Sequence, residues 1–162
     1  MTGLPCSGKT TIAKRIIELM PHLDIDHLDG DIVRKSFTAD LGFSKEDRDE
    51  NIRRVSYVAS YLSHIEDKIV ICTFVSPYKE ARDKVRNMCE NFVEVHVDAD
   101  IAVCEKRDVK GMYALARSGV IKDFTGVSDP YESPMTPEMR VFTDTYTVDE
   151  CAHIIINNMG WV

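Results

Sequence analysis

A glycine-rich stretch near the start of the chain has the residue types and the spacing of a phosphate-binding loop. Residues 3–10 read G-L-P-C-S-G-K-T and match the pattern G-x-x-x-x-G-K-T. In such a loop the glycines let backbone N–H groups curl around phosphate oxygens, while Lys9 adds a mobile positive charge and Thr10 offers a hydroxyl to Mg²⁺. We therefore predict that ATP and Mg²⁺ bind here, to Gly3, Leu4, Pro5, Cys6, Ser7, Gly8, Lys9, Thr10 and Thr11.

The strand that normally precedes a phosphate loop has little sequence to form it. Only Met1 and Thr2 stand before Gly3, whereas the motif usually follows a strand in the middle of a sheet. We expect either that the sequence begins late or that this central strand is short or absent. In the second case the fold should be less stable.

Two carboxylates, Asp29 and Asp31, flank Gly30 where a short strand should end beside the loop. A carboxylate at this place can orient an acceptor hydroxyl, or bind Mg²⁺ through water. The alternative is an ordinary Asp-Gly turn without a chemical role. The motif alone leaves both interpretations open.

A group of basic residues follows. Arg48, Asn51 and Arg54 lie on adjacent turns of a predicted helix and can share one face, with Arg34 and Arg53 nearby. A planar guanidinium suits a pair of phosphate or sulfate oxygens. A solvated basic face without a ligand is the alternative.

The rest of the sequence predicts the elements that must position these residues. Apolar residues at helical spacing over 12–20 predict a helix that Pro21 ends, and uninterrupted apolar residues over 69–75 predict a strand buried on both faces. Serine and threonine three residues before an acid, at 44–47 and 147–150, resemble capping boxes. Further strands are predicted at 92–98 and 141–143, and further helices at 44–62, 79–90, 101–106, 111–117 and after 147.

Strands that alternate with helices predict a parallel sheet with helices on both faces. We therefore expect an α/β fold of P-loop NTPase type, a three-layer sandwich in one domain that spans residues 1–162. Residues 107–137 carry glycines, prolines and many charges with little regular structure. A segment that long is usually functional, and we expect it to form a lid.

Composition narrows the function classes. The net charge of −7 disfavours nucleic acid as a partner, and no apolar stretch approaches the ~20 residues of a membrane-spanning helix. The five cysteines are odd in number and form no C-x-x-C pair, which indicates reduced thiols in a cytoplasmic protein. Cys6 stands near a helix N-terminus, which is expected to lower the pKa of its thiol.

An ordered set of motifs resembles one enzyme family. GLPCSGKTT, LDGDIVR, LGFSKEDRDENIRR, FVSPYKEAR, VHVDADIAVCEKRDVKGMYALARSG and FTGVSDPYESP occur in this order over nearly the whole chain. Together they resemble the adenylylsulfate kinase (APS kinase) family. The resemblance implies transfer of the γ-phosphate of MgATP to the 3′-hydroxyl of adenylyl sulfate, which gives 3′-phosphoadenylyl sulfate in sulfate assimilation.

The resemblance also implies roles at the phosphoryl-transfer centre. Lys9, Asp31 and Ser76 would be the catalytic residues, with Asp31 orienting or deprotonating the 3′-hydroxyl and joining Thr10 at the metal. Ser76 matches a serine described in the family as a phosphorylated intermediate. Because in-line transfer needs only positioning and charge neutralisation, we expect a contact role for Ser76 instead.

Further roles concern the two nucleotides. Arg107 would lie over the ATP base. The residues expected to bind the acceptor are Asp29, which supports the turn, Arg34, Arg48 and Asn51 at its phosphosulfate and ribose, Phe43 and Phe124 on either side of its adenine, and Lys110 in the lid. Such families are commonly homodimers, and ATP sulfurylase is an expected partner in trans.

Two alternatives stay open. The lid lacks two lysines that are common in the family, which weakens its positive field, and the arginines and phenylalanines do not distinguish adenine from cytosine. A kinase of the same fold that acts on another nucleotide-like acceptor, such as a cytidine diphosphoramidate, is therefore the first alternative. A non-catalytic nucleotide-binding module is the second, although Lys9, Thr10 and Asp31 are all present.

Overall fold

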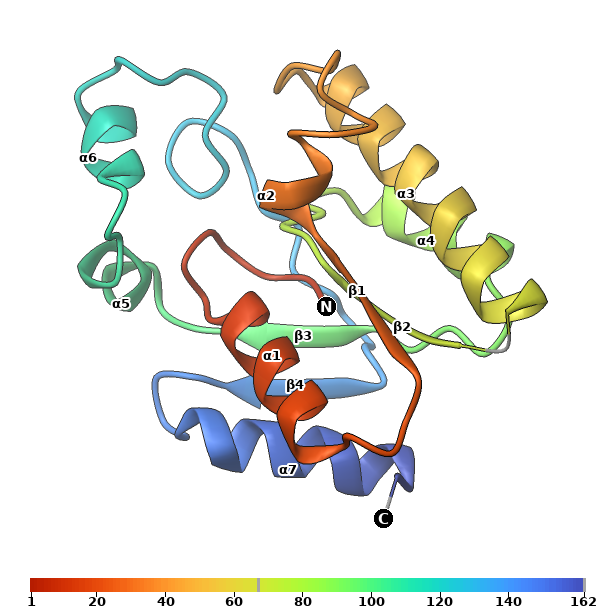
Figure 1. Cartoon of the computed structure of the whole chain (residues 1–162). Helices are drawn as coiled ribbons and strands as arrows, with labels where there is room; N and C mark the ends of the chain where they lie inside the picture. The colour runs from red at the N-terminus through yellow and green to blue at the C-terminus, as the bar shows by residue number, and fades with distance from the viewer. Residues whose placement is uncertain (67, 162) are drawn as a thin grey trace.

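Strands and helices alternate along the chain in the computed structural model, which describes residues 1–66 and 68–161 (Figure 1). The elements are α1 (Lys9–Leu19), β1 (Ile25–Asp29), α2 (Gly30–Val33), α3 (Lys45–Ile65), β2 (Ile69–Thr73), α4 (Lys79–Met88), β3 (Val95–Asp98), α5 (Ile101–Lys106), α6 (Met112–Arg117), β4 (Met139–Phe142) and α7 (Val148–Met159). The predicted helices and strands are present, although β3 is shorter than the strand predicted over 92–98.

Helices cover both faces of the strands, as predicted. α1 packs against α7 on one side, and α3 packs against α4 on the other (Figure 1). The larger core lies under α1 and α7 and the second under α3 and α4. This is the arrangement of an α/β three-layer sandwich. In the described part of the chain, no helix combines the length and the apolar character needed to cross a bilayer.

The strands form two parallel pairs that the first two residues join. β1 pairs with β2, and β3 pairs with β4. Between the pairs, the Met1 ammonium donates to the Cys72 carbonyl at 2.7 Å, and the Thr2 amide donates to the Val95 carbonyl at 2.9 Å. Met1 and Thr2 therefore form a stub of the expected central strand.

A cavity of about 470 Å³ lies between β2 and β3, beyond this stub. Apolar side chains from the helices on both sides line it: Ile16, Ile155 and Met159 on one side, and Ile52, Val55 and Ala59 on the other. The prediction that residues 69–75 are buried on both faces is therefore wrong for Ile69, Val70, Cys72 and Val75, which are only half-buried. The reason is that Ile69, Val70 and Cys72 border this cavity, although β1 pairs with the strand.

Side-chain caps set two helix starts, as the sequence predicts. The Ser44 hydroxyl accepts a hydrogen bond from the Asp47 amide at 3.1 Å at the start of α3. At the start of α7, Thr147 and Glu150 form a complete capping box. Each cap satisfies N–H groups that lack a partner within the helix.

The predicted lid contains one short helix, α6, within otherwise irregular chain. Tyr113 of α6 packs with Cys104 of α5 and with Phe124 in a hydrophobic cluster of its own. The Tyr113 hydroxyl donates to the Pro5 carbonyl at 2.9 Å. The lid is thereby attached to the phosphate loop (residues 3–10).

Candidate active site

Two glycines shape the phosphate loop. A Cβ at Gly3 would lie 2.3 Å from the Val97 carbonyl oxygen, so the close approach of loop and β3 requires glycine at this position. Gly8 precedes α1 with φ 102°, a conformation that residues with a side chain rarely adopt. The loop therefore leads directly into the N-terminus of α1, where free N–H groups and the helix dipole favour an anion.

Lys9 is buried inside the loop. Its Nζ donates to the carbonyls of Gly3 at 2.9 Å and Leu4 at 2.7 Å. Burial lowers the pKa of Lys9 to about 8, because a desolvated ammonium is less stable than a hydrated one. The loop thus holds a positive charge whose acceptors are weak, and a phosphate anion would stabilise that charge much more strongly.

Asp29 lies next to the loop at the end of β1. Its Oδ2 accepts a hydrogen bond from the Thr10 hydroxyl at 2.7 Å, and its Oδ1 accepts one from the Asp31 amide at 2.8 Å. Burial raises the pKa of Asp29, but these hydrogen bonds outweigh it, so that the pKa is lowered overall. An ionised carboxylate therefore stands beside the Thr10 hydroxyl, and in this structure it is Asp29 that contacts Thr10.

The Asp31 side chain reaches the lid. It is 72% exposed and forms an ion pair with Lys110. The hydrogen bond that Lys110 donates to this carboxylate raises the pKa of Lys110. This ion pair thus joins α2 to the lid, at two positions that are 79 residues apart in the chain.

An aromatic ring and two guanidinium groups meet between the end of α2 and the start of α3. Phe43 is 57% exposed, and the guanidinium carbons of Arg34 and Arg48 lie 4.6 Å and 5.8 Å from the centre of its ring. The Phe43 carbonyl accepts a hydrogen bond from Arg48 Nε at 2.8 Å. This cluster presents a flat apolar surface next to two permanent positive charges.

Arg48 also reaches the lid. It donates to the Asp123 carbonyl and, at 3.0 Å, to the Thr125 hydroxyl. These contacts bring the segment around Phe124 next to Phe43. Phe124 itself is only 8% exposed, and its ring packs edge-on against Tyr113 with 4.9 Å between ring centres.

The Phe124 ring is therefore buried in this structure, although its neighbours in the sequence are polar. Its neighbours Asp123 and Thr125 bond to Arg48 through a carbonyl and a hydroxyl. The ring meanwhile joins the cluster beneath α6. A polar sequence context does not determine which way one ring turns.

Asn51 and Arg107 occupy different parts of the site. Asn51 is buried, and its Oδ1 has no hydrogen-bond partner among the described residues. Arg107 donates to the hydroxyl and carbonyl of Thr143 at 2.9 Å and 2.5 Å, and that hydroxyl donates to the Ser7 carbonyl at 2.8 Å. Thr143 thus connects Arg107 to the phosphate loop, a link that the sequence analysis missed.

Ser76 follows β2 in an unusual backbone conformation, with φ 43°. Its carbonyl accepts a hydrogen bond from buried Arg82 at 2.7 Å. The sequence analysis also missed Arg82, which lies within the helix predicted at 79–90. Its position four residues after Tyr78 and three before Val85, both on the inward face of α4, is the signal that could have identified it.

The expected low pKa of the Cys6 thiol is not found. Burial raises this pKa, and the nearby Asp108 carboxylate raises it further. Both effects disfavour the thiolate. The position close to a helix start is therefore outweighed by the surroundings of the side chain.

The geometry brings two kinds of subsite together. The phosphate loop, with Lys9 and Thr10, suits a nucleotide triphosphate, and the Phe43 cluster suits a planar base with anionic groups. Asp31 and Lys110 stand between the lid and the end of β1. Such a pair of subsites is what transfer of a phosphoryl group between two nucleotides requires.

Comparisons with known proteins show which family the chain resembles. A family model described as adenylylsulphate kinase matches residues 1–142. The adenylyl-sulfate kinase of Halothermothrix orenii is 51% identical over 157 residues, which cover 96% of this chain and 84% of that protein.

Solved structures of APS kinases share the fold. The structure of the Mycobacterium tuberculosis APS kinase CysC in complex with AMPPNP and APS matches with a TM-score of 0.93 at 38% identity, over 98% of this chain and 94% of that chain. A hexameric APS kinase from Thiobacillus denitrificans matches with a TM-score of 0.73 at 32% identity, over 99% of this chain and 28% of that chain. With its ordered motifs, its phosphate loop and its P-loop NTPase fold, the chain belongs to the adenylylsulfate kinase family.

Proposed function

We propose that this chain transfers the γ-phosphate of ATP to the 3′-hydroxyl of adenylyl sulfate, through the residues described above. The observation that carries the assignment of residues is the position of Asp31 in α2, two residues after the end of β1, where Asp29 lies against Thr10. From there the exposed Asp31 carboxylate can meet an acceptor held near Lys110 and Phe43. The M. tuberculosis relative, solved with AMPPNP and APS, supports two nucleotide subsites.

ATP binds at the phosphate loop in this proposal. The backbone N–H groups after Gly3 surround the phosphates, and Lys9 moves from its carbonyl partners to the β- and γ-phosphates. Arg107 lies over the base. Since Arg107 already reaches the loop through Thr143, binding of the base and binding of the phosphates are mechanically linked.

The oxygen donors present suit Mg²⁺. Thr10 supplies a hydroxyl, and Asp31, together with Asp29 behind Thr10, supplies carboxylates, which are the hard ligands that this ion prefers. When bound, Mg²⁺ neutralises charge on the β- and γ-phosphates. These three side chains supply oxygen atoms and negative charge close to the positive charge of Lys9.

The acceptor binds at the cluster formed by Arg34, Phe43 and Arg48. Phe43 stacks on its adenine, and the two guanidinium groups bind the phosphosulfate. Asn51, whose buried Oδ1 lacks a partner among the described residues, is a hydrogen-bond acceptor for a ribose hydroxyl. Phe124 completes the adenine site from the lid, which requires its ring to turn out of the cluster around Tyr113.

Asp31 orients the 3′-hydroxyl and accepts its proton as the oxygen attacks the γ-phosphorus. The bond between the γ-phosphorus and the bridging oxygen breaks, and ADP leaves. Before this transfer, as the anionic acceptor binds, Lys110 exchanges Asp31 for the acceptor. Ser76 contributes a contact near the transferring group and forms no covalent intermediate.

We further propose that the chain works as a homodimer in the cytoplasm. The hexameric APS kinase of T. denitrificans supports assembly into oligomers in general. The five cysteines are free thiols in the structure, which is typical of a reducing compartment. Association with ATP sulfurylase in trans would supply the acceptor directly.

The acceptor is tested by measuring ADP release from MgATP with adenylyl sulfate, AMP, a cytidine diphosphoramidate and shikimate at equal concentrations. We expect a strong preference for adenylyl sulfate. Preference for the cytidine compound would favour the first alternative acceptor, because Phe43 and the arginines fit either base. No release with any of the four would favour a non-catalytic nucleotide-binding module.

The phosphate loop is tested with Lys9→Ala. Turnover should be abolished while the fold stays intact, because the partner of the Lys9 charge is the phosphate of the ligand rather than another side chain. Circular dichroism confirms the fold and ADP release measures turnover. Turnover close to that of the wild type would refute the role of the loop.

A further inference from the structure

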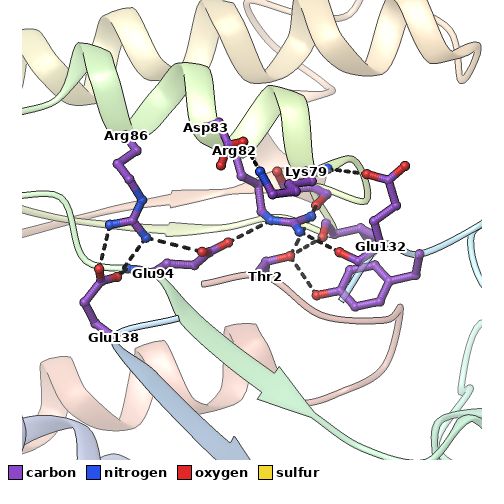
Figure 2. Close-up of polar contacts among 11 residues, drawn as sticks. Thr2, Lys79, Arg82, Asp83, Arg86, Glu94, Glu132 and Glu138 are labelled. Atoms are coloured by element: carbon purple, nitrogen blue, oxygen red, sulfur yellow. Dashed lines mark hydrogen bonds and ion pairs between the residues drawn. The ribbon is translucent and has the colours of Figure 1, made fainter. Parts of the chain in front are cut away.

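A buried arginine in α4 contacts both the segment beside the phosphate loop and the end of the lid. Arg82 of α4 is only 5% exposed, yet it belongs to none of the subsites described above. Figure 2 shows it at the centre of a polar network between α4, β3 and the returning lid segment. Burying a guanidinium is costly unless each of its donors finds a partner.

Each side of this guanidinium has a different partner. Nε lies 2.7 Å from the Glu94 carboxylate, at the start of β3. One terminal nitrogen donates to the Ser76 carbonyl at 2.7 Å, and the other donates to the Glu132 carbonyl at 2.5 Å. The rigid planar fork therefore sets the relative position of three chain segments.

The first segment borders the phosphate loop. Ser76 has φ 43°, a conformation that costs free energy and persists only when its surroundings enforce it. The Thr2 hydroxyl donates to the carbonyls of Val75 at 2.7 Å and Ser76 at 3.3 Å. Arg82 and Thr2 thus both donate hydrogen bonds to the Ser76 carbonyl. Thr2 directly precedes Gly3, the first residue of the phosphate loop.

The second segment is the trailing end of the lid. The Glu132 amide donates to the Pro77 carbonyl at 2.8 Å, and its carboxylate accepts from the Lys79 amide at 2.6 Å. Tyr131 shares a 2.9 Å hydrogen bond with the Thr2 hydroxyl. Glu132 and Tyr131 therefore attach the lid to the same turn that Arg82 holds.

We propose that Arg82 is a positioning residue for phosphoryl transfer. Its guanidinium fixes the Ser76 backbone beside the phosphate loop and anchors the lid at Glu132, with Glu94 as the charge partner. It touches neither nucleotide in the binding mode proposed above, on which this inference rests. Displacing reacting groups by about 1 Å can lower a rate by roughly 100-fold, so a buried anchor of this kind can control kcat.

The test compares Arg82→Lys with Arg86→Lys. A lysine at position 82 keeps the positive charge but cannot bind Glu94, Ser76 and Glu132 at once. Arg86 is the matched control, since it lies one turn further along α4 and pairs with Glu94 at 3.3 Å and with Glu138 at 2.6 Å (Figure 2). Both variants keep the net charge of the chain.

For Arg82→Lys we expect kcat to fall by about 10- to 100-fold, with the KM values for ATP and for the acceptor changed by less than about threefold, because the ligand contacts themselves are kept. Hydrogen exchange should become faster at the Glu132 and Lys79 amides. For Arg86→Lys we expect kcat within about twofold of the wild type, since half-exposed ion pairs contribute little. Assays run well below the melting temperature of each variant.

A wild-type kcat in Arg82→Lys overturns the proposal, whether or not hydrogen exchange changes. So does a lower kcat with unchanged exchange at Glu132. If Arg82→Lys does not fold, Glu94→Gln replaces it, and we expect the same direction of change from loss of the charge partner. Hydrogen exchange needs no substrate, so failure of the proposed reaction in the wild type is recognised separately from failure of this anchor.

Discussion

Lys9 is already buried in the phosphate loop before its phosphate ligand binds. Its ammonium is buried among loop carbonyls, and the pKa falls from 10.5 to about 8. Because the folded pKa lies below the unfolded one, the charged lysine destabilises the fold fully below about pH 8, and this penalty is relieved as pH rises toward 10.5. A bound phosphate raises the pKa again and removes the penalty at neutral pH.

The first prediction concerns the pH dependence of ATP use. kcat/KM for ATP reports the free enzyme, so it should fall above a pKa of about 8, as Lys9 loses its proton. kcat should stay level to higher pH, because bound phosphate keeps Lys9 charged. Initial rates between pH 7 and 10 measure both quantities.

Lys9→Arg is the control for this profile. A guanidinium keeps its charge throughout the range, so the remaining activity should lose the fall near pH 8. A wild-type kcat/KM that stays level up to about pH 9.5 would contradict the assigned pKa.

Arg48 combines two contacts in one side chain, since it lies near the Phe43 ring and bonds to the lid at Asp123 and Thr125. The second prediction is that Arg48→Ala raises the KM for adenylyl sulfate by about 10- to 100-fold, through loss of a charged hydrogen-bond donor. The KM for ATP should change by less than about threefold. Steady-state kinetics with each substrate varied in turn measure the two effects.

Arg53→Ala is the matched control, because Arg53 lies on the same helix and pairs with Glu50 on the exposed side. Its KM values should equal those of the wild type. Equal increases in both KM values for Arg48→Ala would place this residue outside the acceptor subsite.

At the scale of elements, capping residues in the local sequence define where a helix begins. α7 begins at a capping box, in which the Glu150 carboxylate accepts from the Thr147 amide at 2.8 Å and the Thr147 hydroxyl accepts from the Glu150 amide at 3.3 Å. The helix then presents Cys151, Ala152, Ile155 and Ile156 to the core. Its strand-like isoleucines are helical because the cap and the apolar spacing agree.

The third prediction is that Thr147→Ala lowers the free energy of unfolding by about 1 kcal/mol. For a chain of this size the melting temperature should fall by roughly 2–4 °C. Activity well below the transition should not change, because α7 lies away from both subsites. Thr145→Ala is the control, since among the described residues the Thr145 hydroxyl hydrogen-bonds only to its neighbour Asp144, and we expect its melting temperature to match the wild type. An equal fall in both variants would contradict the capping role.

On the scale of the whole molecule, the sheet is held together by a stub of two residues. Met1 and Thr2 bridge β2 and β3, and the cavity of about 470 Å³ extends from there between the two strands. Burial lowers the pKa of the Met1 ammonium, because its charged form is less stable at the end of an apolar space than in water. Both features reduce stability.

The fourth prediction is that five apolar residues added before Met1 raise the melting temperature by at least about 5 °C, which corresponds to roughly 2 kcal/mol for a chain of this size. They would replace the ammonium by an amide and pair with β2 and β3, with apolar side chains on both faces. An equally long glycine-serine extension is the control. Equal melting temperatures for the two extended chains would contradict this account of the cavity, and scanning calorimetry measures both.

The sequence by itself determined the local features of this protein. The glycine spacing, the two caps and the apolar runs depend on residues within a few positions of one another, so the phosphate loop, the order of helices and strands and the family could be predicted from it. The ordered motifs also named the residues to examine, from Lys9 to Phe124.

Only the tertiary structure decided which of these residues meet. It placed Asp29 rather than Asp31 against Thr10, turned the Phe124 ring into the cluster around Tyr113, and connected Arg82 to Ser76 and Glu132. These contacts join positions far apart in the chain and depend on how whole elements pack. Their energies come from burial and from hydrogen bonds that no local pattern contains.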